Sequence, residues 1–82
     1  MEDAKETLKS YKDISGSIWT IFKAGIETID KESDSWWEEM NEELDKILKK
    51  YEGTEFQTYA RSYANNVLNE IERLVKRRNG RE

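Results

Sequence analysis

The chain has 82 residues and a formal net charge of -4, with 35% hydrophobic and 39% charged residues, so it fits one domain with a small core. It contains no cysteine and no histidine, which excludes a disulfide framework and the residues most used as general bases and transition-metal ligands. Aromatic residues make up 11% of the chain, a share that favours a folded protein over a disordered one. We therefore expect a single domain over residues 1–82, with 79–82 as a flexible tail.

The first predicted helix covers roughly residues 3–31. At about 100° per residue, its apolar side chains fall within an arc of about 160°. They are Leu8, Tyr11, Ile14, Ile18, Trp19, Ile21, Phe22, Gly25, Ile26 and Ile29. The arc keeps its phase on both sides of Gly16, so we expect one long helix that can kink near this glycine. Trp19 lies at the edge of the arc, where we expect an exposed aromatic side chain.

A second helix is predicted at roughly 35–51 and a third at 54–78. Two residue pairs have the spacing of a capping box, and two glycines stand where helices usually stop. The pairs are Ser35 with Glu38 and Thr54 with Gln57, and the glycines are Gly53 and Gly80. Each segment has one apolar face, and none alternates with a period of two. Because the connections are short, we predict an all-α fold, an antiparallel three-helix bundle.

The second predicted helix is shorter than the first, at about 26 Å against roughly 40 Å by the usual rise per residue. It cannot cover the whole apolar stripe of its neighbours, so some of Leu8, Tyr11 and the far end of the third helix would lie open or meet a second copy. An open apolar stripe is a physical reason to expect a homodimer or a groove for a partner.

Charges are distributed unevenly along the chain. Residues 27–45 hold nine acids and one base, residues 1–26 are balanced, and residues 46–82 hold nine bases and five acids. This pattern predicts a dipolar molecule with a concentrated negative end, which attracts basic proteins and repels nucleic acid. The candidate acidic face consists of Asp30, Glu32, Asp34, Glu38, Glu39, Glu42, Glu43 and Asp45.

Structural explanations account for part of the acidic stretch. Acids at the start of a helix complement its dipole, and Glu42–Lys46 and Asp45–Lys49 have the spacing of stabilising pairs. A calcium loop beginning at Asp30 fails, because Ser35 stands where the loop needs glycine and Asn41 where it needs glutamate. We therefore predict no metal site and no cofactor.

The third predicted helix has a polar face rich in asparagine, which costs roughly 0.5 kcal/mol relative to alanine inside a helix. The face consists of Ser62, Asn65, Asn66, Asn69, Arg73 and Arg77. Two interpretations remain open: drift on a tolerant surface, or a hydrogen-bonding contact face for a ligand or a subunit.

The first residues are acidic and polar, unlike a signal peptide, and the most apolar stretch, 14–29, is interrupted by Lys23 and Glu27. We therefore expect a cytoplasmic protein with no membrane partner, although secretion without a leader would leave the same pattern. The sequence has no phosphate-binding glycine loop, no cysteine- or histidine-based dyad and no zinc-ligand spacing, so we do not expect an enzyme.

Three hypotheses about function follow. The first is a non-enzymatic protein-binding domain, an inhibitor, immunity-type or regulatory protein that presents its acidic face to a basic protein. The second is a self-associating structural protein, a homo-oligomer with Trp19 and Asn66 in a symmetric interface. The third is a nucleic-acid binder that uses the basic C-terminus, which the acidic middle of the chain would oppose.

Overall fold

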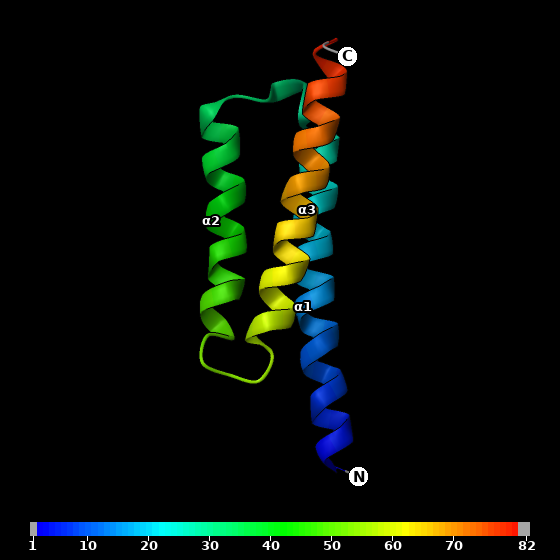
Figure 1. Cartoon of the computed structure of the whole chain (residues 1–82), viewed down its shortest axis with the longest axis vertical. Coiled ribbons are helices and arrows are strands. Elements are labelled where there is room, and N and C mark those ends of the chain that lie inside the picture. The colour runs from blue at the N-terminus through cyan, green and yellow to red at the C-terminus, as the bar shows by residue number, and fades with distance from the viewer. Residues whose placement is uncertain (1, 81–82) are drawn as a thin grey trace.

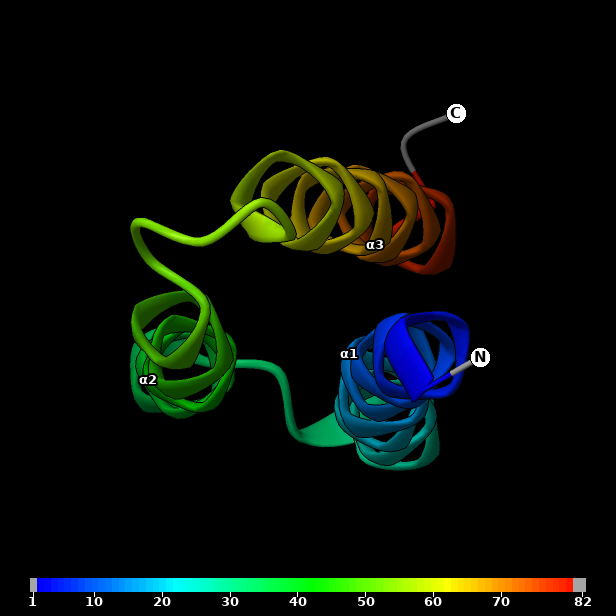
Figure 2. The same ribbon diagram turned by 90° about the horizontal axis from the view of Figure 1, so that it is seen from below.

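The computed structural model describes residues 2–80, with side chains from residue 4 onward. Within this range the chain forms four helical elements and no strand: α1 (Glu2–Glu27), the short 3-10 helix η1 (Ile29–Lys31), α2 (Asp34–Lys50) and α3 (Gln57–Arg78). The three α-helices run up, down and up (Figure 1), and they form the corners of a triangle when viewed along the bundle (Figure 2). The predicted all-α three-helix bundle is confirmed.

The first helix runs without interruption through Gly16 and ends four residues before the predicted boundary. At this end, the Thr28 hydroxyl donates a hydrogen bond to the Ala24 carbonyl oxygen at 2.8 Å. Lys31 N then bonds to Thr28 O at 2.8 Å, which closes the tighter turn of η1. The regular α-helical bonding therefore gives way to the tighter turn at Thr28, and α1 ends before the predicted residue.

The second helix starts one residue earlier than predicted and has a different cap. Ser33 is the N-cap, and its hydroxyl oxygen accepts a hydrogen bond from Trp36 N at 3.3 Å. The predicted capping box of Ser35 and Glu38 is therefore wrong, because Ser35 lies inside the first helical turn while Ser33 has the extended backbone of a cap. The predicted stop is confirmed, since α2 ends at Lys50 and Gly53 follows with a left-handed φ of 79°.

The third helix begins at Gln57, three residues later than predicted, because residues 51–56 form a hydrogen-bonded turn. Thr54 Oγ1 donates to the Tyr51 carbonyl at 2.6 Å, and Gln57 Oε1 accepts from Gly53 N at 2.7 Å. Thr54 and Gln57 thus brace the turn and do not serve each other's amides as a capping box would. α3 ends as predicted, with Gly80 at a φ of 73°. The predicted tail covers residues 79–82, of which residues 81–82 lie outside the described part of the chain.

The core lies along the axis where the three helices meet. Its buried members are Ile14, Ile18, Met40, Leu44, Tyr51, Ala60, Ala64, Val67, Ile71 and Val75. Trp36 and Trp37 are partly buried and pack against this core. The bundle measures 51 × 19 × 18 Å, and the first turns of α1 extend past the α2–α3 connection (Figure 1). None of the described helices is long and apolar enough to cross a membrane.

Candidate functional site

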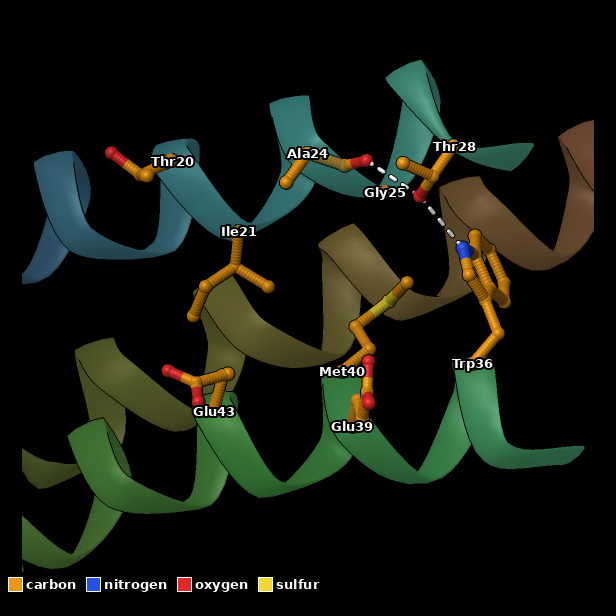
Figure 3. Close-up of a pocket in the computed structure, with 9 residues that line it drawn as sticks. All are labelled: Thr20, Ile21, Ala24, Gly25, Thr28, Trp36, Glu39, Met40 and Glu43. Carbon is orange, nitrogen blue, oxygen red and sulfur yellow. Dashed lines mark hydrogen bonds between the residues drawn. The ribbon is translucent and has the colours of Figure 1, made fainter. Parts of the chain in front are cut away.

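A groove of about 360 Å³ lies between α1 and α2, in the half of the bundle near η1 (Figure 3). We call it the α1–α2 groove. One wall comes from α1 and the other from α2. It is lined by Thr20, Ile21, Ala24 and Gly25 of α1, by Thr28 just after the end of α1, and by Trp36, Glu39, Met40 and Glu43 of α2.

The floor of the groove is apolar and depends on small residues in α1. Gly25 is buried, and a Cβ atom added to it would stand 2.9 Å from Met40 Cε and 3.2 Å from Ile71 Cδ1. The missing side chain therefore allows Met40 to pack directly on α1. Ala24, on the same helix, is exposed and leaves the floor open to solvent. Gly25 thus lets Met40 form the floor, and the small side chain of Ala24 leaves that floor uncovered.

Trp36 closes one end of the groove, and hydrogen bonds hold it in place (Figure 3). Its indole Nε1 donates to Thr28 Oγ1 at 2.8 Å, and the same hydroxyl donates onward to Ala24 O at 2.8 Å. Trp37 packs edge-to-face on Trp36, with ring centroids 5.0 Å apart, and donates from Nε1 to Glu32 Oε2 at 2.7 Å. The two indoles fasten the α1–α2 connection to both helices, so this end wall is preorganised.

The rim of the groove is acidic. Glu39 and Glu43 lie one helical turn apart on α2, and both are exposed. Glu43 pairs with Lys46 at 3.3 Å, so the predicted pair between Glu42 and Lys46 is wrong. Among the described side chains, Glu39 has no ion pair, and neither do Glu38 and Glu42, which lie on α2 outside the groove lining.

The structure brings only part of the predicted acidic face to the groove. All eight of its carboxylate residues are exposed, but only Glu39 and Glu43 line the groove. Glu32 is held by Trp37, and Asp45 forms its predicted pair with Lys49 at 3.5 Å. Asp30 lies in η1 and Asp34 starts α2, so both are at the connection.

The fold brings acidic and basic segments of the chain to the same end of the molecule. Because the bundle has three helices, α3 ends at the same end as η1 and the start of α2 (Figure 1). The basic last turn of α3, which contains Lys76, Arg77 and Arg78, therefore lies at the same end as the acidic connection. These cations offset part of the negative charge there, so the concentrated negative end stays a prediction. Glu38, Glu39 and Glu42 on α2 form no ion pair with a described side chain.

The polar face of α3 lies apart from the groove. All six of its residues, Ser62, Asn65, Asn66, Asn69, Arg73 and Arg77, are exposed. Arg73 pairs with Glu70, and Lys76 pairs with Glu72 at 3.9 Å, so two of the cations near the C-terminus already have partners. Trp19 has an exposed fraction of 53%, as its place at the edge of the apolar arc suggests, and it does not line the groove.

A second, more open depression continues between α1 and α2 toward the other end of the bundle, and Thr20 borders both. Here Tyr51 Oη donates to Asp13 Oδ2 at 2.5 Å, and Lys50 Nζ donates to the same oxygen at 3.0 Å. These bonds lower the pKa of the Asp13 carboxyl, with the Tyr51 bond contributing most. Burial raises the pKa of Tyr51 to about 12, and the bond to Asp13 adds to this effect. The three side chains fasten α1 to the end of α2.

Sequence reasoning missed the groove because its α1 wall is formed by residues at or outside the edge of the apolar arc. Thr20, Ala24 and Thr28 recur every four residues on one flank of α1, beside Gly25. This row of small side chains could have indicated that α1 either approaches a neighbouring helix closely or leaves an open space beside it. In residues 2–80 no group of three acidic side chains is placed to hold a metal ion. Comparison with known protein families, curated proteins and solved structures finds no match.

Proposed function

We propose that this protein is a non-enzymatic protein-binding domain, a regulator or inhibitor whose α1–α2 groove holds an amphipathic helix from a basic partner. One observation carries the proposal: an open apolar floor lies directly beside two glutamates that are one turn apart. Helices commonly bind in grooves through apolar side chains at every third or fourth position. The chain contains no cysteine, which is compatible with the reducing cytoplasm, where we propose that it acts.

The floor and the rim have different roles in this proposal. Contact of an apolar side chain with Ile21, Ala24 and Met40 would supply most of the affinity, because apolar burial is the main favourable term in association. Glu39 and Glu43 would select partners with lysine or arginine beside the apolar residues, and would speed their encounter. The end wall at Trp36 needs no rearrangement, which reduces the entropy lost on binding.

A synthetic helical peptide tests the proposal, with leucines at positions i, i+3, i+4 and i+7 and lysines on both sides of them. We expect saturable binding by calorimetry. Replacing Glu39→Lys and Glu43→Lys should weaken it by about tenfold or more, because attraction at the rim becomes repulsion.

The matched control is Glu38→Lys with Glu42→Lys. It changes the net charge equally on α2, at residues that do not line the groove. This control should bind the peptide nearly as well as the original protein, and raising the salt concentration should weaken both. Equal loss of binding in the two double variants would mean that the peptide responds to total charge, and the groove proposal would then be wrong.

A further inference from the structure

A second unpartnered surface runs along α1. Three of its large apolar side chains are exposed, with exposed fractions of 68% for Leu8, 53% for Trp19 and 40% for Ile26. Lys12 and Lys23 are exposed beside them, and neither forms an ion pair with a described side chain. At about 100° per residue these five residues fall within about 60° of the helix surface. We call them the α1 stripe.

The α1 stripe and the α1–α2 groove lie on different flanks of the same helix. The Ser15 hydroxyl, next to the stripe on the wheel, hydrogen-bonds to the hydroxyl of Tyr59 on α3 at 2.7 Å. Thr28 and Asp13 mark the other flank, because they bond to Trp36 and Tyr51 at the two ends of α2. Lys12 also borders the more open depression, so it stands at the margin of the stripe.

The two surfaces are complementary in both apolarity and charge. The groove has an apolar floor with acids on its rim, and the stripe has apolar side chains with lysines beside them. Trp19 and Lys23 lie one turn apart on α1, as Glu39 and Glu43 do on α2. A stripe of this kind is itself the basic amphipathic helix that the groove fits.

We infer that a second copy of this chain is a partner of the groove, and that it docks its α1 stripe there with Trp19 as the anchor and Lys23 against Glu39 and Glu43. This inference rests on the proposed function of the groove. Because the two contacting surfaces differ, the association is head-to-tail. Each copy in a pair keeps one free groove or one free stripe, so assembly continues as the concentration rises. This differs from the symmetric homodimer expected from the sequence.

Complementary blocking variants test the inference. The groove variant carries Glu39→Lys and Glu43→Lys, and the stripe variant carries Trp19→Ala and Lys23→Glu. The mass of the original protein, measured by sedimentation equilibrium from about 1 µM to about 1 mM, should rise with concentration and fall in high salt. Each variant alone should remain a monomer. An equimolar mixture of the two should form a 1:1 pair and nothing larger, because only one intact groove and one intact stripe remain.

Three results would each overturn the inference: a monomeric original protein throughout this range, a mixture that stays monomeric, or a single variant that still associates. Control proteins with Glu38→Lys and Glu42→Lys, or with Arg61→Glu, should associate like the original. Circular dichroism of every variant checks that it is folded. The leucine–lysine peptide separates the two proposals, because its binding to the groove would persist if only self-association failed and would be absent if the groove itself had no binding function.

Discussion

Two glycines in α1 have different surroundings, although both lie inside one helix. Apart from its chain neighbours and the nearby backbone of α1, no described atom lies within 4 Å of the place that a Cβ on Gly16 would occupy, whereas a Cβ on Gly25 would stand 2.9 Å from Met40 Cε. We expect Gly16→Ala to stabilise the protein by about 0.5–1 kcal/mol, because alanine restricts the unfolded chain and favours helix. Gly25→Ala has the same advantage in helix propensity, but its new methyl group must displace Met40. The free energy of unfolding should therefore rise less than for Gly16→Ala, or fall. Urea unfolding of both variants measures the difference.

Tyr51 links the pH dependence of stability to a single buried hydroxyl. Its pKa is raised from 10.0 to about 12, so the folded state favours the neutral form. The resulting stabilisation is fully present below pH 10 and is lost as the pH rises through 12. We expect the free energy of unfolding of the original protein to fall more steeply over this range than that of Tyr51→Phe. Parallel slopes in urea unfolding at successive pH values would contradict this role for Tyr51.

At the scale of elements, the cap of α2 can be tested with two serines two residues apart. Ser33→Ala removes the hydroxyl that accepts from Trp36 N, and should cost about 1 kcal/mol of stability. Ser35→Ala leaves that acceptor in place and loses only a 3.2 Å bond between the two serine hydroxyls, so it should cost less. Thermal unfolding of the two variants distinguishes the cap found in the structure from the cap predicted from sequence.

The existence and packed faces of the helices were predictable, because apolar periodicity persists over many residues and tolerates local errors. Helix ends were less predictable, since they depend on single side-chain bonds. Serine is a suitable N-cap residue at either position 33 or 35, and in the structure the N-cap of α2 is Ser33. The exposure of the acidic residues is the usual position of charged side chains. The groove could not be predicted from one helix at a time, because residues of both α1 and α2 line it.

At the scale of the whole molecule, the length of 51 Å reflects the overhang of α1 (Figure 1). Ala4, Lys5 and Glu6 are all exposed, whereas Ile14 is fully buried. We expect deletion of residues 1–6 to change the free energy of unfolding by less than about 0.5 kcal/mol. Ile14→Ala should cost about 2–5 kcal/mol, because it opens a cavity in the core. A large loss of stability in the deletion variant would show that the overhang contributes to the bundle.

The same up-down-up order determines how the molecule would respond to mechanical force. The start of α1 and the end of α3 lie at opposite ends of the bundle, and the two helices are parallel (Figure 1). A pull on these two ends would slide α1 along α3 in shear, so the Ser15–Tyr59 bond and the Tyr11–Phe56 ring contact would bear load together. The shear-loaded α1–α3 pair is therefore the mechanical clamp of this small protein.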